Sequence, residues 1–475
     1  MENNLTSKLH QHKYKKGLIQ PPMNTLDNKQ PAFWTHDRLP EYLWLGLILM
    51  NGSRTQGMVK AGKILKKIST INKNIIKPKL SIILNLPNDE QEKIYQIICE
   101  EIKPSILSPL TVLFRNDQYP LFNQYFYNKH IYVNKRIDIL NSTIKRYYGH
   151  QSNESTDLRY VVLSMLIFQD KLKIAFEGSQ LAEALMKYPY TEHSDEKMRF
   201  YRPSIRSTEI IDINTTPNYD YINSFWKEIG MLTDCQPIVI KGKKINSEID
   251  FKKYVLDFQE KLNYLILKEK EKCILDNKFD VIIGTSTYIL RIFNDILEKD
   301  LDTSILARLG IRTIIESFIN IKYLLKTENE HENIWEEYKL YGLGKYKYVL
   351  LKSRELNDTN EDSHFSENLI DIFINEILWE EFVDIDLRYF DNKKIKDKFE
   401  DVDEADLYNI SYEYNNNFSH GFWGAIRESS MLCCNNSSHK YHLIPDVNFE
   451  QEMTSVNYDI YIILEKLSKI IENEF

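Results

Sequence analysis

The chain contains few of the residues that interrupt regular structure. Its 475 residues include 15 glycines and 14 prolines, about 3% each, whereas globular proteins average about 7% and 5%. No alternation of apolar and polar residues persists for more than a few positions, so a large β-sheet is not expected. We therefore predict an all-α protein built from long helices. A chain of this length exceeds one ordinary core, which indicates more than one domain.

Cysteine is also scarce. The five cysteines, Cys99, Cys235, Cys273, Cys433 and Cys434, are odd in number and contain no CxxC spacing. We interpret them as free thiols in a reducing compartment. Because Cys433 and Cys434 are adjacent, they are poorly placed for one half of a zinc site, and we expect no structural metal. The sequence has neither a P-loop nor a G-x-G-x-x-G fingerprint, and no cofactor is expected.

Further absences concern location and charge. The N-terminal MENNLTSKLHQHKYKK lacks the apolar segment of a signal peptide. The longest apolar run, 43–50, is far shorter than the roughly 20 residues of a membrane span. We therefore expect a cytoplasmic protein without membrane contact. The net charge of −8 argues against a general nucleic-acid coating protein. A lysine-rich stretch from Lys60 to Lys79 is the best local candidate for such contact.

Helical periodicity divides what remains. Residues 1–32 are polar and are interpreted as a tail, 33–270 as an N-terminal helical domain of unknown role, and 271–475 as a C-terminal helical bundle. Between residues 188 and 220 the periodicity fades, and we expect a long irregular segment. The predicted C-terminal helices are 276–298, 302–327, 331–356, 364–380, 403–421 and 453–473. Asp302-Thr303-Ser304 is a suitable N-cap sequence for the second of these.

Two rows of polar residues are the strongest functional signal. Each row is spaced i, i+4, i+8 in a segment predicted to be helical, so its three side chains share one face. The first row is Arg312, Glu316 and Asn320, extended backwards by Arg308, and the second is Tyr412, Asn416 and His420, with Ser419 beside it. One site built from both rows requires the two helices to meet.

Each row also has an ordinary structural interpretation. An exposed Arg312–Glu316 pair one turn apart contributes only a few tenths of a kcal/mol to helix stability. A histidine before a helix-ending glycine, as His420 stands before Gly421, is often structural. In the functional interpretation, the helix dipole favours the protonated form of His420, which suits proton transfer near neutral pH.

The C-terminal half resembles the bacterial DUF5677 family, an all-α group related to HEPN domains. The resemblance is carried by RTIIESFINIKYLL, by the tyrosine-rich IWEEYKLYGLGKYKYV, and by the Tyr-x3-polar-x3-His pattern of the second row. The family usually has serine where this chain has Asn416. The resemblance covers roughly residues 275–430. The segment WTHDRLPEYLWLGLIL is similar to an N-terminal extension of some of these proteins.

HEPN domains are commonly metal-independent ribonucleases of toxin–antitoxin, abortive-infection and CRISPR systems. Their active site is an Arg-x4-6-His motif, usually completed across a homodimer. The resemblance therefore implies an antiviral-defence or toxin-type effector with RNA as its substrate, a homodimeric state, and a partner protein or antitoxin. This chain departs from the motif, because no arginine lies five to seven residues before a histidine. Its catalytic cation must come from another helix.

The resulting hypothesis assigns roles to both rows. His420 transfers the proton, Arg312 stabilises the phosphorane, and Glu316 orients Arg312 or acts as a second base. The expected substrate-binding residues are Arg308, Asn320, Tyr412, Asn416 and Ser419. Two alternatives remain open. The rows form a buried network in a non-catalytic binding or regulatory protein, or the second domain is a small-molecule sensor with a closed cavity between its helices.

Overall fold

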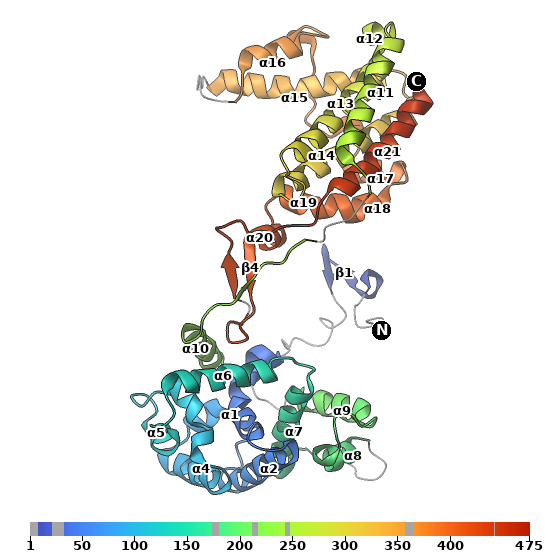
Figure 1. The fold of residues 1–475 in the computed structure, drawn as a ribbon. Helices are drawn as coiled ribbons and strands as arrows, with labels where there is room; N and C mark the ends of the chain where they lie inside the picture. The colour runs from blue at the N-terminus through green and yellow to red at the C-terminus, as the bar shows by residue number, and fades with distance from the viewer. Residues whose placement is uncertain are drawn as a thin grey trace. The chain divides into compact units, whose positions relative to one another are not determined.

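The computed structural model describes residues 8–20, 33–172, 180–210, 217–242, 248–356, 364–440 and 442–475. Their regular structure is almost entirely helical (Figure 1), which confirms the all-α prediction. The chain forms two compact units. The N-terminal unit comprises residues 1–236 together with 434–442, and the C-terminal unit comprises 237–433 together with 443–475. Within the described ranges, no helix is long and apolar enough to cross a membrane.

The division falls near residue 236, whereas the boundary predicted from the sequence follows residue 270. The helix between these positions, α11 (Phe251–Lys268), explains the difference. It directs Val255, Phe258, Leu262 and Leu265 into the core of the C-terminal unit. Its apolar face therefore belongs to that unit.

The N-terminal unit is a helical assembly around one apolar core. A π-helical turn (Trp34–Arg38) leads into α1, in which Pro40 occupies the first turn and every residue is buried. Such an all-round apolar helix is stable only when other helices surround it, and α2, α6 and α7 do so. The unit contains α1 (Leu39–Leu49), α2 (Arg54–Ile71), α3 (Leu80–Leu84), α4 (Asn88–Glu101), α5 (Pro120–Phe126), α6 (Val133–Tyr147), α7 (Asn153–Phe168), α8 (Gln180–Lys187), α9 (Met198–Ile210) and α10 (Tyr219–Met231).

The prediction of a long irregular segment at 188–220 is wrong over α9. This helix contains Pro203, yet Met198, Tyr201 and Ile205 lie on one face and are buried in the N-terminal unit. Tertiary burial of that face outweighs the local signal of the proline. The predicted polar tail contains a short antiparallel hairpin, β1 (Lys13–Lys15) and β2 (Leu18–Gln20). Residues 1–7 and 21–32 of that tail, and residues 211–216 of the predicted irregular segment, lie outside the described residues.

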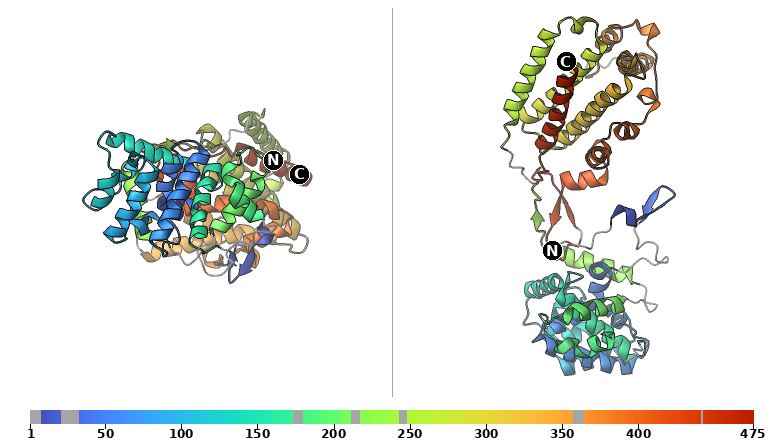
Figure 2. Two further views of the ribbon diagram at one scale, coloured as in Figure 1. Left: turned by 90° about the horizontal axis from the view of Figure 1, so that it is seen from below. Right: turned by 90° about the vertical axis from the view of Figure 1, so that its right-hand side faces the viewer.

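The C-terminal unit is a helical bundle centred on α14, which contacts α13, α17, α19 and α21. Figure 2 shows α21 beside α11 and α14 in this unit. Ser304 caps α14 by accepting a hydrogen bond from the Ala307 N–H (3.2 Å), as its sequence predicted. Besides α11, the helices are α12 (Lys272–Leu275), α13 (Asn277–Glu298), α14 (Ile305–Thr327), α15 (Ile334–Leu356), α16 (Glu367–Ile374), α17 (Ile395–Asp401), α18 (Ala405–Leu407), α19 (Glu413–Ser419), α20 (Trp423–Ser430) and α21 (Asn457–Glu474).

Three short strands complete this part of the chain. They are β3 (Pro237–Ile238), β4 (Met431–Cys434) and β5 (Leu443–Pro445), in the order β3-β4-β5. Strands β4 and β5 are antiparallel, with Leu432 opposite Ile444. The loop that joins them, residues 435–442, lies in the N-terminal unit. Helix α16 and the segment after it pack on α15 through a small cluster of Leu350, Ile374 and Val383, and Glu376 and Ile377 of that segment line the cleft described below.

Candidate functional site

The two polar rows meet where α14 packs against α19. The Arg312 guanidinium donates one hydrogen bond to the Tyr412 hydroxyl (2.9 Å) and another to the Asn416 amide oxygen (3.3 Å). It also pairs with the Glu316 carboxylate (3.2 Å). The Tyr412 hydroxyl in turn donates to Glu316 Oε2 (3.1 Å). We call Arg312, Glu316, Tyr412 and Asn416 the four-residue network.

The network is half-buried and electrically balanced. The side chains of Arg312 and Glu316 keep 27% and 35% of their surface exposed, whereas Tyr412 is buried. Burial and the nearby Glu316 charge raise the pKa of Tyr412, against the opposing effect of Arg312. Tyr412 therefore stays protonated around neutral pH and remains a donor to Glu316. The arrangement fixes the carboxylate and leaves one side of it open to solvent.

Local structure explains why Asn416 faces α14. Asn415 donates its side-chain amide to the Ser411 carbonyl (2.7 Å), and Asn417 donates to the Glu413 carbonyl (2.8 Å). Both amides thus satisfy carbonyls one turn back, a use of asparagine that competes with ordinary helix packing. Asn416 lies between them and turns to Arg312. A π-helical turn (Tyr408–Tyr412) directly precedes α19 and ends on the network tyrosine.

The remaining predicted site residues lie outside this network. His420 ends α19, is exposed, and stacks its ring on Phe422 with 5.3 Å between centroids. Among the described residues, no hydrogen bond or ion pair joins the His420 ring to Arg312 or Glu316. Ser419 is exposed. Arg308 is buried and donates to the carbonyl of Thr454. The hydrogen-bonded core of the site is therefore smaller than the predicted set.

A cleft of about 670 Å³ opens beside the network. It lies between α13, α14, α15 and the segment 376–398, all in the C-terminal unit. Glu316 and Asn320 reach it from α14, so the first polar row lines one wall. Aromatic side chains line much of the remainder, among them Tyr338, Tyr341, Tyr346, Tyr389 and Phe390. The predicted sensor cavity would be closed, whereas this cleft is open and is lined by several titratable groups.

Lys398, on α17, is the cleft residue that the sequence analysis missed. It is only 4% exposed, and its ammonium lies 4.8 Å from the Phe390 ring centroid and 4.9 Å from that of Tyr323. In the described part of the chain no carboxylate lies within ion-pairing distance of it. Burial lowers the pKa of Lys398 to about 8, although Asp391 and Glu316 act in the opposite direction. By contrast Lys393, also in the cleft, pairs with Asp401 (2.5 Å).

A second group of buried charges lies in the N-terminal unit. Arg38, from the π-helical turn, and Arg159, from α7, both face the fully buried Glu209. The Arg159 guanidinium lies 4.6 Å from the Trp34 ring centroid, and burial lowers the pKa of Arg159 to about 10. The sequence feature that could have indicated this group is the polar segment that precedes α1. These contacts hold that segment onto α7 and α9, and we assign them a structural role.

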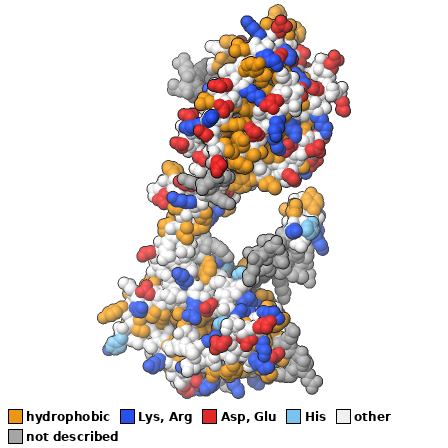
Figure 3. Space-filling model, turned by 45° about the vertical axis from the view of Figure 1, so that its right-hand side comes forward, with side chains coloured by type: hydrophobic (Ala, Val, Ile, Leu, Met, Phe, Trp, Pro, Cys, Tyr) orange, Lys and Arg blue, Asp and Glu red, His pale blue; other side chains and the backbone are white. Residues whose placement is uncertain are grey.

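Some side chains of the lysine-rich stretch, residues 60–79, are buried or paired within the N-terminal unit. Lys77 is buried and donates to the backbone carbonyl of Glu209 (3.2 Å). Lys67 pairs with Glu100 and Glu101. On the face of the molecule that Figure 3 displays, basic and acidic side chains are interspersed. Packing and ion pairing therefore account for two lysines of this stretch, Lys67 and Lys77.

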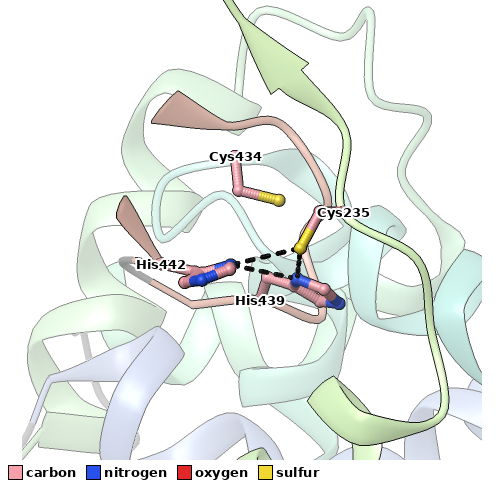
Figure 4. A group of neighbouring side chains, drawn as sticks. All are labelled: Cys235, Cys434, His439 and His442. Carbon is pink, nitrogen blue, oxygen red and sulfur yellow. Dashed lines mark hydrogen bonds between the residues drawn. The ribbon is translucent and has the colours of Figure 1, made fainter. Parts of the chain in front are cut away.

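Four side chains in the N-terminal unit are positioned to hold a metal ion, which the sequence analysis did not expect. They are Cys235, Cys434, His439 and His442, shown in Figure 4. The sequence predicted no metal because Cys433 and Cys434 are adjacent. Successive side chains of a strand point in opposite directions, so only Cys434 joins the group, whereas Cys433 accepts a hydrogen bond from Arg427 (2.6 Å).

Comparison with known proteins identifies one family. Residues 279–438 match the model of a family of unknown function, DUF5677. No curated protein and no solved structure matches the chain. The match covers about a third of the 475 residues and includes α14, α15 and α19, the elements of the network and the cleft. It confirms the resemblance of the C-terminal half to this family.

Proposed function

We propose that the C-terminal unit binds a ligand of nucleotide size that carries an anionic group, and that the cleft is its binding site. Lys398 carries the proposal, because a buried cation without a carboxylate partner favours an anion beside it. The cleft volume of about 670 Å³ falls within the roughly 300–1,000 Å³ of small-molecule sites. The surrounding tyrosines and phenylalanine offer faces for a planar ring.

The four-residue network supplies the polar end of this site. Glu316 lines the cleft, accepts a hydrogen bond from Tyr412 and forms an ion pair with Arg312. A ligand donor that bonds to Glu316 would compete with these partners and shift α19 relative to α14. Occupancy of the cleft would thereby change the surface that carries His420, one turn beyond Asn416.

Calorimetric titration of the full chain with nucleoside 5′-monophosphates, free nucleosides and inorganic phosphate tests the proposal. We expect a monophosphate to bind more tightly than its nucleoside, and Lys398→Met to weaken that binding at least tenfold. Lys393→Met is the matched control, since Lys393 lines the same cleft but is already paired with Asp401. Absence of monophosphate binding, or equal affinity in the Lys398→Met protein, would contradict the proposal.

RNA cleavage is the second candidate, and the surface around His420 favours it. His420 follows Asn416 by one turn, and its neighbours Phe422 and Trp423 are 54% and 62% exposed. Exposed aromatic rings stack nucleic-acid bases, while a phosphate across one helical turn of about 5.4 Å would contact both His420 and the Arg312 side. As in HEPN ribonucleases, a homodimer and a partner antitoxin would belong to this proposal.

In this reaction the RNA 2′-oxygen forms a bond to phosphorus and the 5′-oxygen leaves. His420 would take or give the transferred proton, and Arg312 would stabilise the charge on the phosphorane. We expect RNA cleavage in the presence of a chelator, lost in His420→Ala and Arg312→Ala and kept in the control His364→Ala. Cleavage that persists in both site variants would refute this assignment.

A non-catalytic role for the network has its own support. Arg312, Glu316, Tyr412 and Asn416 satisfy one another within a single chain. If the network only fixes the packing of α14 on α19, Glu316→Gln will lower the free energy of unfolding and leave ligand affinity unchanged.

A further inference from the structure

The group formed by Cys235, Cys434, His439 and His442 lies outside the proposed site and belongs wholly to the N-terminal unit. Cys235 lies between α10 and β3, Cys434 ends β4, and the two histidines lie in the loop before β5. Figure 4 shows the Cys235 sulfur and both imidazole rings converging, with Cys434 beside them. The four ligand atoms all lie within 4.8 Å of one another.

The spacing of these atoms matches the edges of a tetrahedral metal site. The Cys235 sulfur is 3.4 Å from His439 Nδ1 and 3.5 Å from His442 Nδ1, and the two Nδ1 atoms are 3.3 Å apart. With Zn–S near 2.3 Å and Zn–N near 2.0–2.1 Å, a tetrahedron separates sulfur from nitrogen by roughly 3.6 Å and two nitrogens by roughly 3.3 Å. The three measured edges therefore leave room for one ion.

The surroundings fix the ligand atoms. His439 Nε2 lies 2.9 Å from the backbone carbonyl of Thr233. A carbonyl only accepts, so this nitrogen carries the proton and His439 Nδ1 directs its lone pair at the centre of the group. A metal-binding histidine usually has such a partner on its other nitrogen. The Gln236 N–H points at the Cys434 sulfur (3.4 Å) and would stabilise it as a thiolate.

Backbone contacts hold the loop in register with Cys235. The Asn435 N–H donates to the Gln236 carbonyl (2.8 Å), and the Asn436 side chain donates to the Asp234 carbonyl (2.8 Å). These bonds flank Cys235 on both sides. The pattern Cys434-x4-His439-x2-His442 thus meets Cys235 from a distant part of the sequence.

We infer that Cys235, Cys434, His439 and His442 bind one zinc ion and form a structural site that fastens loop 434–442 within the N-terminal unit. Two thiolates and two imidazoles gathered within 4.8 Å of one another favour zinc over metals that prefer oxygen ligands. Four protein ligands leave no open position, which distinguishes structural from catalytic zinc. Because the ligands come from sequence positions so far apart, the ion would stabilise the folded loop against a large loss of chain freedom.

Elemental analysis of the purified full-length protein tests the inference. We expect one zinc per chain in the wild type, and less than about a tenth of that in Cys434→Ser and in Cys235→Ser. Cys433→Ser is the matched control, because Cys433 is adjacent but bonds to Arg427, and it should retain the metal. Cys434→His keeps four ligands and should retain zinc and fold, which separates ligand loss from damage to β4.

Two further measurements test the zinc site besides the metal content. Cobalt(II) added to the metal-free protein should give the visible absorption of a tetrahedral thiolate site in the wild type and in Cys433→Ser, and not in Cys434→Ser or Cys235→Ser. Trypsin should cut after Lys440 in the chelator-treated protein, while the zinc form resists. Wild type without stoichiometric metal, a Cys235–Cys434 disulfide in the mass spectrum, or metal loss in Cys433→Ser equal to that in Cys434→Ser would overturn the inference.

Discussion

Lys398 combines deep burial of its ammonium with a lowered pKa. Its folded-state pKa of about 8 lies below the ordinary value of 10.5 because the ammonium is buried. The charged form therefore destabilises the fold below pH 8. As the pH rises, the folded state loses this proton before the unfolded state does, so the penalty disappears between about pH 8 and pH 10.5.

Replacement of Lys398 by methionine should remove that penalty. At pH 7 we expect the free energy of unfolding to rise by about 1–3 kcal/mol, with the advantage shrinking toward pH 10. Urea unfolding at both pH values measures this, with Lys393→Met as the reference. A Lys398→Met protein that is less stable at pH 7 would show that the lysine contributes to packing through its ring contacts.

Among individual residues, part of the polar site could be predicted from the sequence. Helical spacing is local, so Arg312 and Glu316 on one helix face, and Tyr412 and Asn416 on another, followed from i, i+4 positions. The orientation of the His420 ring depends on the end of α19 and on its stacking with Phe422. The burial of Lys398 depends on aromatic rings from other elements. Neither the orientation of the His420 ring nor the burial of Lys398 can be predicted from spacing along one helix.

Among the elements, α14 positions most of the polar site, and its N-terminus depends on one side chain. Ser304 accepts the hydrogen bond of an otherwise unpaired helix N–H. Ser304→Ala should lower the free energy of unfolding by about 1 kcal/mol. Thr303→Ala, one residue outside the cap, is the control and should change it by less than half as much. Equal effects of the two changes in thermal unfolding would contradict the capping argument.

Helix α15 contains a matched pair of glycines beside the cleft. An ideal Cβ at Gly344 would lie 2.3 Å from the backbone oxygen of Asp384, whereas one at Gly342 would meet nothing within 4 Å. Gly344→Ala should therefore destabilise the C-terminal unit by about 1–3 kcal/mol. Gly342→Ala should stabilise it by up to about 1 kcal/mol. Calorimetric unfolding of both variants measures these changes. An unchanged stability of Gly344→Ala would show that the backbone at Asp384 moves away from the added Cβ at little cost.

Two π-helical turns coincide with the two groups of polar residues, Trp34–Arg38 before α1 and Tyr408–Tyr412 before α19. Such turns are often found at functional sites. Sequence periodicity predicted the neighbouring helices, because apolar spacing of 3.6 residues is regular. It does not distinguish a single wider turn. The helix α9 was missed for the opposite reason, since its proline is a strong local signal that tertiary burial overrides.

At the scale of the whole molecule, the chain is acidic, with a net charge of −8. The proposed RNA binding would therefore depend on a few cations. If Arg312 and His420 contact one or two phosphates, log K against log salt should have a slope between about −0.7 and −1.4. Filter binding of single-stranded RNA across a salt series measures the slope. A value near −4 or steeper would place the RNA on a broad basic surface elsewhere.

The organisation into two helical units was predictable from length and periodicity, but their boundary and the return of loop 434–442 were not. The pairing of Cys235 with Cys434 depends on the path of the chain through both units. The spacing of residues along the sequence does not predict a contact between two such distant segments. Counting cysteines does not reveal the candidate metal-binding group, because it combines one distant cysteine with a short Cys-x4-His-x2-His segment.

The pH dependence of ligand affinity tests the central claim, that Lys398 makes the cleft an anion site. A nucleoside monophosphate has its second pKa near about 6 and stays dianionic above pH 7, so a change between pH 7 and 9.5 reports the protein. We predict that wild-type affinity falls with a midpoint near pH 8, that Lys393→Met behaves likewise, and that Lys398→Met is weak throughout. A wild-type affinity that stays constant over this range would contradict the account.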